Sequence, residues 1–263
     1  LQLTTVAEAE ELKNFLSGTP AESLFVEGAE RALGSARFVL SKYLPAHLTM
    51  PDGDFSLRDW LENPNGGNLF ITWREDMAES LRPLISCFLD ILFSSLLSMP
   101  EDEQRRLWAF IDELASLEAL SSLEAALTKG RKAGLRVVAG LQSISQLDML
   151  YGKEKATVLR SCFRNLVVLG GSKTDADTAK AMSIALGTHD VIRDNESHTS
   201  ANKGGSTNRS EHIETDEPVV TPAEITSLPD LTAYVAFATN YPITRVLMPV
   251  EKFETINTAI QEA

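Results

Sequence analysis

Residues 106–114 read Arg-Leu-Trp-Ala-Phe-Ile-Asp-Glu-Leu, and this stretch decides the fold prediction. An apolar run ends abruptly at two adjacent carboxylates, Asp112 and Glu113, and a second, mostly apolar run at 135–141 ends at Gln142. Short, continuous apolar runs are typical of strands buried in a parallel sheet. Because ligands of open α/β sheets bind outside the carboxyl ends of the strands, we expect these polar residues to border a binding site.

The pattern around these two runs predicts a sheet with helices between its strands. Residues 1–48 show helical spacing only, and the chain then alternates between apolar runs and helical patterns. This alternation predicts an α/β fold with a parallel sheet that helices cover on both faces. The expected helices are 6–16, 29–44, 81–97, 117–129, 153–162 and 176–186, and the expected strands are 68–73, 107–111, 137–141 and 166–169.

The C-terminal third contains three further signals. Residues 194–217 are polar and without periodicity, which predicts a mobile loop. Thr221-Pro222-Ala223-Glu224 has the pattern of a capping box with proline at the first helical position. The runs 233–238 and 244–249 predict an antiparallel hairpin at the edge of the sheet.

Composition excludes several classes of protein. The net charge of −13 over 263 residues argues against a broad phosphate-binding surface, although it leaves room for a few basic residues in a pore; the acidity is also explained by solubility alone. Cys87 and Cys162 lie in apolar segments, as expected in a reducing cytosol, and no Cys/His cluster has metal-ligand spacing. Arg82 and Asp90 interrupt the most apolar segment, and no signal peptide is present. Since the sequence begins without methionine, we expect a soluble fragment or a trimmed chain.

The residue types at the strand ends suit NTP hydrolysis. One carboxylate can hold hydrated Mg²⁺, a second can orient or deprotonate the attacking water, and an amide can sense the γ-phosphate. Asp112, Glu113 and Gln142 supply these groups, and four apolar residues before Asp-Glu form a Walker B pattern. The alternative is that Asp112 or Glu113 only caps the following helix.

Arg131 lies at the end of the helix predicted between the two strands. A helix of about twelve residues is about 18 Å long and runs back to the opposite edge of the sheet, so Arg131 should not reach its own Asp112. It could instead reach a neighbouring subunit's nucleotide as an arginine finger, or it could interact only with the helix dipole. No Gly-x-x-x-x-Gly-Lys-Ser/Thr motif occurs in the sequence, so the chain lacks a phosphate-binding P-loop.

The two motifs at 106–117 and 127–143 closely resemble those of the TrwB/TraD coupling proteins of bacterial conjugation. The resemblance to the TrwB branch covers nearly the whole chain. It extends to residues 35–41, 49–56, 66–76 and 228–235.

This resemblance implies a RecA-like P-loop NTPase core plus part of an all-α lobe. Residues 1–50 would be the second part of that lobe, and 51–263 the nucleotide-binding domain without its P-loop segment. It implies a hexameric, DNA-dependent ATPase that uses ATP and Mg²⁺ and couples the relaxosome to a type IV secretion channel. Such proteins sit on the cytoplasmic face of the bacterial inner membrane through an N-terminal anchor, which this chain lacks.

The resemblance also assigns roles to individual residues. Asp112 and Glu113 would be the Walker B pair, with Asp112 holding Mg²⁺ through water. Gln142 would sense the γ-phosphate, and Arg131 would be the finger that acts in trans. The alternative function is a non-catalytic module that binds relaxosome or secretion components, and the sequence upstream of Leu1 would distinguish the two.

Overall fold

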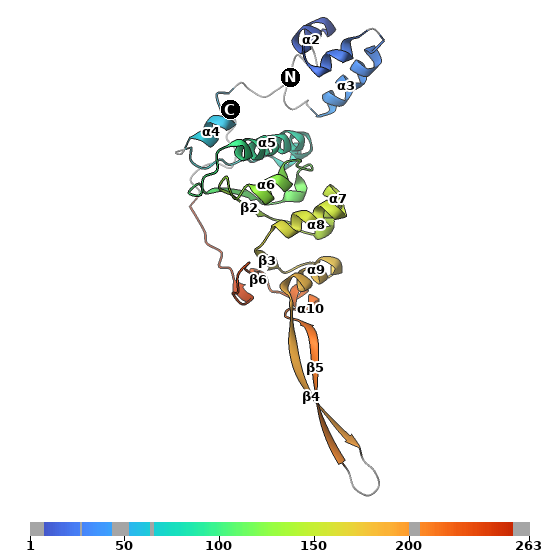
Figure 1. Ribbon diagram of the computed structural model, residues 1–263, viewed down its shortest axis with the longest axis vertical. Helices are drawn as coiled ribbons and strands as arrows, with labels where there is room; N and C mark the ends of the chain where they lie inside the picture. Colours follow the sequence, from blue (N-terminus) through green and yellow to red (C-terminus); the bar gives the residue numbers. More distant parts are fainter. Residues whose placement is uncertain (1–7, 27, 44–52, 64–65, 200–205, 255–263) are drawn as a thin grey trace. The chain divides into compact units, whose positions relative to one another are not determined.

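The computed structural model describes residues 8–26, 28–43, 53–63, 66–199 and 206–254 (Figure 1). The chain divides into two units, 1–141 and 142–263. The first unit contains α2 (Ala9–Leu16), η1 (Pro20–Phe25), α3 (Glu30–Tyr43), α4 (Leu57–Glu62), η3 (Glu75–Met77), α5 (Ala78–Ser98), β1 (Leu107–Ile111), η4 (Leu114–Ser116), α6 (Leu123–Lys129) and β2 (Leu135–Ala139). The second contains α7 (Ile144–Tyr151), α8 (Lys153–Cys162), β3 (Leu166–Leu169), α9 (Ala176–Leu186), β4 (Thr188–Thr199), β5 (Ser206–Pro218), α10 (Pro222–Thr226), β6 (Thr232–Ala236) and β7 (Thr244–Leu247).

The helices at the start of the chain confirm the expected helical pattern. In α2, Leu12 is buried, and α3 coincides with the predicted second helix within one residue at each described end. The first residues of the predicted helix at 6–16, and Leu44 at the end of the second, lie outside the described residues.

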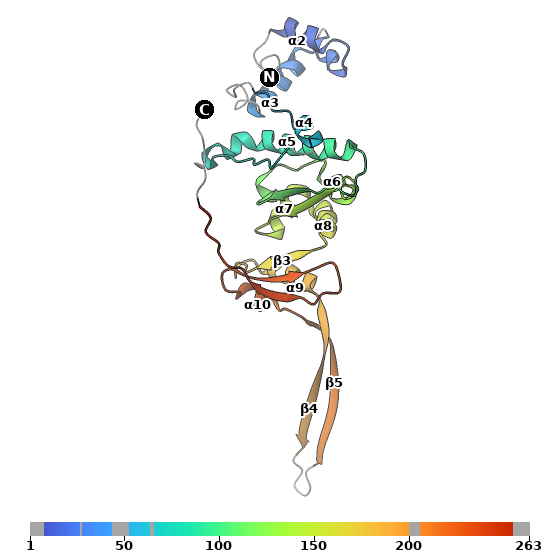
Figure 2. The ribbon, with the colours of Figure 1, turned by 90° about the vertical axis from the view of Figure 1, so that its left-hand side faces the viewer.

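Helix α5 is the main core helix of the first unit. Ile85, Leu89, Phe93 and Leu96 follow helical spacing and are buried. Residues 75–98 are long and apolar enough to cross a membrane by length and composition, with a mean hydropathy of 1.5. Part of this segment is buried, since α5 packs against α6 (Figure 2).

Strands β1 and β2 confirm the predicted parallel pair. Leu107 pairs with Leu135 and Ile111 pairs with Ala139, so both strands end at the same edge. The expectation that helices cover both faces is wrong for this pair, because Trp108, Phe110 and Val138 are exposed on one face. The rings of Trp108 and Phe110 stack there, with centroids 5.9 Å apart.

The helix predicted at 117–129 is shorter than expected. It comprises the 3-10 turn η4 and then α6, which begins only at Leu123. The apolar positions Leu117, Leu120 and Leu123 are buried as the periodicity suggested. However, the backbone of Ser121 and Ser122 bonds to Asp90 of α5, so tertiary contacts hold 117–122 outside the helix.

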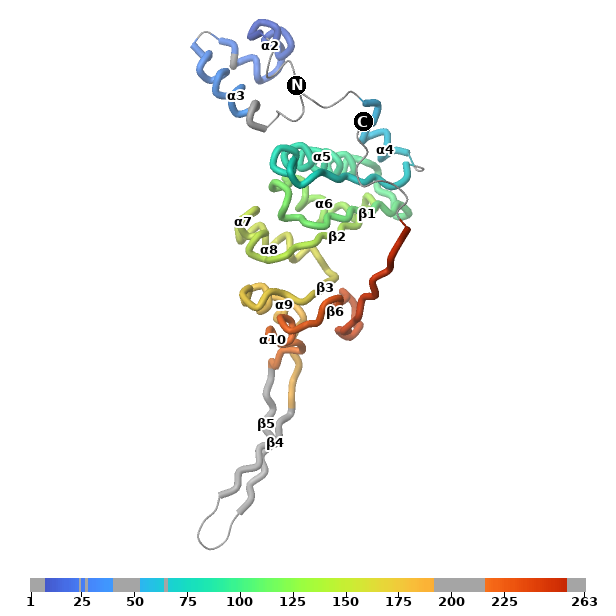
Figure 3. Tube along the Cα trace, turned by 180° about the vertical axis from the view of Figure 1, so that it is seen from behind, coloured from blue at the N-terminus to red at the C-terminus, as the bar shows by residue number. Residues whose placement is uncertain are grey.

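The second unit forms around β3 and the two strands that pair with it. Val168, Leu186, Val220 and Ile225 make its core, and Figure 3 shows α9 and α10 beside β3 and β6. The predicted C-terminal hairpin is confirmed, since β6 pairs antiparallel with β7. Strand β6 also pairs antiparallel with β3. The predicted capping box is present, with the Thr221 hydroxyl accepting from the backbone N–H of Glu224.

Two predictions about backbone conformation were wrong. Most of the expected loop at 194–217 forms the two-stranded ribbon β4–β5, in which Arg193 pairs with His212 and Thr199 with Ser206. A two-stranded ribbon forms through backbone pairing and does not require an apolar face, so polar composition does not reveal it. Residues 200–205 lie outside the described part.

The predicted strand at 68–73 is not formed among the described residues of this segment. A strand exists only where a partner pairs with its backbone, and β-prone composition alone does not supply one. Phe70 is 82% exposed, and an exposed ion pair between Arg74 and Asp76, at 2.6 Å, follows the segment.

Candidate active site

The backbone at the carboxyl ends of β1 and β2 is closely packed. The Gly140 N–H donates to the Ile111 carbonyl at 2.8 Å, and the Leu114 N–H donates to the Gly140 carbonyl at 3.0 Å. A Cβ on residue 140 would lie 1.9 Å from the Asp112 carbonyl oxygen. Glycine is therefore required at this position, and the close approach fixes the backbone that carries Asp112 and Glu113.

Asp112 and Glu113 directly follow β1, as predicted. Asp112 is exposed, and within the described part of the chain its carboxylate has no hydrogen bond or ion pair. Glu113 is half-buried, and its Oε1 is buried without a hydrogen-bond partner. A buried carboxylate oxygen normally finds a donor, because leaving it bare costs about 1–3 kcal/mol.

The helix-capping alternative for these carboxylates is wrong. Glu113 occupies the cap position of η4, but its side chain makes no capping hydrogen bond, and α6 begins only after Ser122. The Glu113 backbone carbonyl, not the carboxylate, accepts from the Ser116 hydroxyl at 2.8 Å. Neither carboxylate therefore caps a helix in the described part of the chain, and the Asp112 carboxylate is exposed.

The donor set suits hydrated Mg²⁺ better than a fully protein-bound metal. No group of three His, Cys, Asp or Glu side chains that could hold a metal is found in the described ranges. Mg²⁺ keeps several waters and is usually held by one or two carboxylates plus substrate phosphates. The exposed Asp112 carboxylate fits that requirement, and the half-buried Glu113 carboxylate lies next to it in the chain.

Gln142 follows β2 by three residues and is the first residue of the second unit. It directly precedes Ser143, whose side chain caps α7 and whose N–H donates to Gln146 Oε1 at 3.2 Å. The conformation after Gln142 is therefore well defined inside its own unit.

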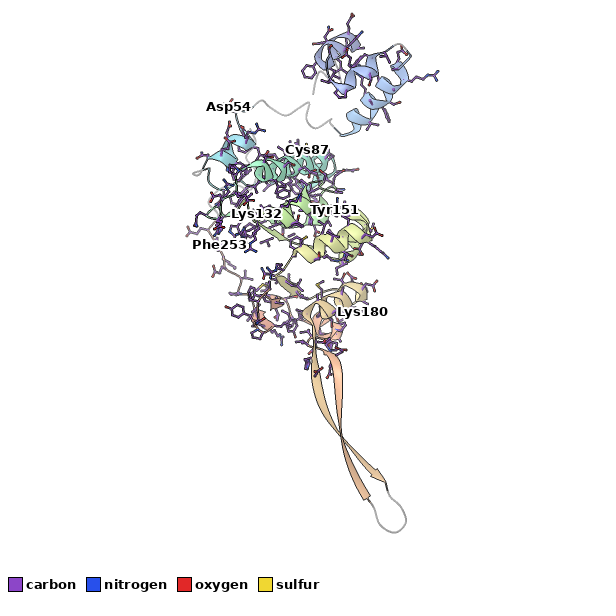
Figure 4. All side chains as sticks on the ribbon, viewed as in Figure 1. Asp54, Cys87, Lys132, Tyr151, Lys180 and Phe253 are labelled. Atoms are coloured by element: carbon purple, nitrogen blue, oxygen red, sulfur yellow. The ribbon has the colours of Figure 1, made fainter. Side chains whose placement is uncertain are left out.

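Arg131 lies in the turn between α6 and β2, beside Lys132, which Figure 4 labels. The Leu107 N–H donates to the Gly134 carbonyl at 3.0 Å, which places this turn beside the start of β1. Asp112 follows the other end of β1, so Arg131 lies at the opposite edge, as the crossover argument predicted. Its side chain is exposed and has no ion pair in the described ranges, whereas Lys132 pairs with Glu101 at 3.0 Å.

The sequence did not point to a polar cluster in the second unit at the starts of α7 and α9. The Thr178 hydroxyl accepts from the Ile144 N–H at 3.1 Å and lies 3.2 Å from the Ser143 hydroxyl. Asp175 caps α9 through the Thr178 N–H at 3.2 Å. Hydrogen bonds from the Thr178 and Ser143 side chains lower the pKa of the Asp175 carboxyl. The spacing of Asp175 and Thr178 signals a cap, but only packing of α7 against α9 reveals the contact with Ser143.

Comparison with known proteins places this geometry in context. Residues 1–249 match the family model described as the type IV secretion-system coupling protein DNA-binding domain. The coupling protein TraD of Escherichia coli (strain K12) is 33% identical over 94% of this chain and 35% of its own length.

Solved structures show the same similarity at higher identity. The unbound monoclinic form of the bacterial conjugative coupling protein TrwBdeltaN70 is 59% identical, with a TM-score of 0.83 over 98% of this chain and 59% of that protein. The plasmid coupling protein TrwB in complex with ADP and Mg²⁺ is 57% identical, with a TM-score of 0.81 over 97% of this chain and 58% of that one. The chain thus spans between about a third and three fifths of the length of these relatives.

Proposed function

The chain belongs to the family of type IV secretion-system coupling proteins, and on that basis we propose that it supplies the hydrolytic half of a DNA-transport ATPase. The complete protein would hydrolyse ATP and move DNA from the relaxosome into a secretion channel during conjugation. The TrwB structure with ADP and Mg²⁺ supports the choice of ligands.

The single observation that carries the proposal is the bare Glu113 oxygen beside the exposed Asp112. In this assignment Asp112 holds hydrated Mg²⁺, and Glu113 orients the attacking water and accepts its proton. Mg²⁺ would neutralise charge that develops on the transferred phosphoryl group. Gln142 would contact the γ-phosphate, and Arg131 would contact the nucleotide of a neighbouring subunit.

The assembly around this chain is part of the same proposal. The sequence carries no P-loop motif, so another segment of the complete protein would hold the phosphates. A homo-hexamer would bring Arg131 of one subunit to the nucleotide of the next. DNA would contact a few basic residues in the pore, which agrees with the net charge of −13. An anchor elsewhere in the protein would hold the assembly at the cytoplasmic face of the inner membrane.

The decisive experiment replaces Glu113 with glutamine in the complete protein. Glu113→Gln should bind ATP with unchanged affinity but lose turnover by about a thousandfold, because the amide cannot accept the proton of the attacking water. Nucleotide binding and phosphate release are the measurements.

Glu124→Gln is the matched control, since Glu124 is exposed on α6, and it should leave both values unchanged. Undiminished turnover of Glu113→Gln would refute the role of Glu113. It would then favour the non-catalytic interaction module as the function of this chain.

A further inference from the structure

The segment after Gln142 is held by a side chain from a different helix. Thr178, in the first turn of α9, accepts a hydrogen bond from the Ile144 backbone at 3.1 Å and contacts the Ser143 hydroxyl at 3.2 Å. Ser143 already caps α7 through its own capping box. Local capping therefore defines the start of α7, and Thr178 adds a connection to α9 that capping does not need.

The same helix is tied at its other end to the base of the β4–β5 ribbon. The buried Ser183 hydroxyl donates to the Val220 carbonyl at 2.6 Å, and the Val219 N–H donates to the Gly187 carbonyl at 3.0 Å. Val219 and Val220 are the two residues that directly follow β5, which ends at Pro218. Helix α9 has 11 residues. Thr178 lies five residues before Ser183 and nine before Gly187, so about 8 to 14 Å of helix separates the attachments.

We propose that Thr178 is a positioning residue for Gln142 and that α9 couples the γ-phosphate sensor to the base of the β4–β5 ribbon. This inference rests on the proposed sensing role of Gln142. A shift of Gln142 towards the γ-phosphate would move Ser143 and Ile144, and Thr178 would carry that displacement into α9. Because α9 is held rigidly at both ends by hydrogen bonds, it would move as one body and shift the strand end at Val219.

Thr178 differs from a threonine that bonds only within its own helix, because its hydroxyl contacts Ser143 and Ile144 at the start of α7. Thr226 of α10 is also half-buried, but its hydroxyl donates only to the Ala223 carbonyl of its own helix at 3.2 Å. Replacing either residue with valine keeps shape and β-branching and removes the hydroxyl. Thr178→Ser retains the hydroxyl and should retain the coupling.

The first test measures ATP turnover in the complete protein for Thr178→Val, Thr178→Ser and the control Thr226→Val. Loss of one hydrogen bond to the sensor segment should lower kcat about tenfold in Thr178→Val and leave KM unchanged. Thr178→Ser and Thr226→Val should keep the parent kcat. Equal kcat values in Thr178→Val and the parent would overturn the positioning role.

A double variant distinguishes this inference from the sensor assignment itself. If Thr178 acts through Gln142, adding Thr178→Val to Gln142→Ala should lower kcat no further. Additive losses would show that Thr178 acts elsewhere and would overturn the inference. Full turnover in Gln142→Ala would instead refute the sensing role in the proposed function, and the inference would fall with it.

Amide hydrogen exchange at Val219 tests the coupling through α9. A non-hydrolysable ATP analogue should change the exchange rate at Val219 in the parent protein but not in Thr178→Val. The Thr226→Val control should respond as the parent does. An exchange rate at Val219 that is the same with and without the ATP analogue in the parent protein would overturn the coupling.

Discussion

Two carboxylate sites in the first unit differ in how their oxygens are bonded. Asp90 on α5 accepts hydrogen bonds from the backbone and hydroxyl groups of both Ser121 and Ser122, including the Ser122 N–H at 2.8 Å. After the end of β1, Glu113 has a buried oxygen that accepts no hydrogen bond from the described residues, and Asp112 beside it is exposed.

Asp90 organises the fold, whereas the proposed function assigns Asp112 and Glu113 to a ligand. The chain satisfies an acidic side chain fully where α5 must hold the segment before α6. It leaves the pair at the strand end bare, although a hydroxyl residue, Ser116, lies close enough to bond the Glu113 backbone. A bare, partly buried carboxylate costs folding free energy, which is expected where function requires it.

The largest expected effect concerns Arg131, a cation that makes no ion pair within the part of the chain that the structure describes. In the complete protein, Arg131→Ala should lower DNA-stimulated turnover about a thousandfold, because a finger that stabilises transition-state charge is worth at least that much. The matched control is Lys132→Ala, which should leave turnover unchanged. Its exposed ion pair with Glu101 contributes less than about 1 kcal/mol to the stability of the fold.

Mixing variants tests whether Arg131 acts in trans. Assemblies of Arg131→Ala and Glu113→Gln subunits should recover part of the turnover, since some interfaces then combine an intact Glu113 with an intact Arg131. Mixtures as inactive as the separate variants would contradict a site at the subunit interface.

The next effect concerns the backbone that presents the bare pair. Gly140→Ala should lower the free energy of unfolding by about 3 kcal/mol, because the added Cβ would lie 1.9 Å from the Asp112 carbonyl oxygen. Urea denaturation measures this loss. Gly171→Ala, at a site with nothing within 4 Å, should change stability by less than about 0.5 kcal/mol. Similar losses of unfolding free energy in Gly140→Ala and Gly171→Ala would mean that the ends of β1 and β2 can move apart without destabilising the fold.

The smallest effect compares the same substitution at the two sites. Asp90→Asn should lower the free energy of unfolding by about 1–2 kcal/mol, since the amide nitrogen cannot accept from Ser121 or Ser122. Asp112→Asn should leave stability unchanged, because its carboxylate is exposed and unbonded. Equal losses of unfolding free energy in Asp90→Asn and Asp112→Asn, measured by urea denaturation, would contradict the difference between the two sites.

The pH dependence of stability sharpens this comparison. Desolvation raises the pKa of Asp90, but hydrogen bonds from Ser122 and Ser121 outweigh it and hold the pKa below its ordinary value. A carboxyl with a lowered folded pKa stabilises the fold above its unfolded pKa of about 3.9 and loses that contribution as the pH falls through the folded value. The stability difference between the parent and Asp90→Asn should therefore shrink below about pH 4. A stability difference that stays constant below about pH 4 would contradict a lowered pKa of Asp90 in the folded protein.

Much of the fold was predictable from apolar periodicity. The strands at 107–111 and 166–169 and the helices at 153–162 and 176–186 match β1, β3, α8 and α9 at both ends. These segments have strong apolar patterns that local spacing alone determines. Two of the failures share one cause, since the absent strand at 68–73 and the ribbon β4–β5 both depend on whether a backbone partner is available. The shortened helix at 117–129 has another cause, the hydrogen bonds from Ser121 and Ser122 to Asp90.

For the candidate site too, part was predictable from the sequence and part depended on tertiary contacts. The types and order of Asp112, Glu113, Gln142 and Arg131 are written in the sequence, because two apolar runs end at polar residues and a crossover separates them. Only the tertiary structure decided that Glu113 does not cap a helix, that Gly140 allows the strand ends to meet, and that Thr178 touches the segment after Gln142. Chain order sets which groups a strand can present, whereas packing between distant segments sets which of those groups remain without a partner.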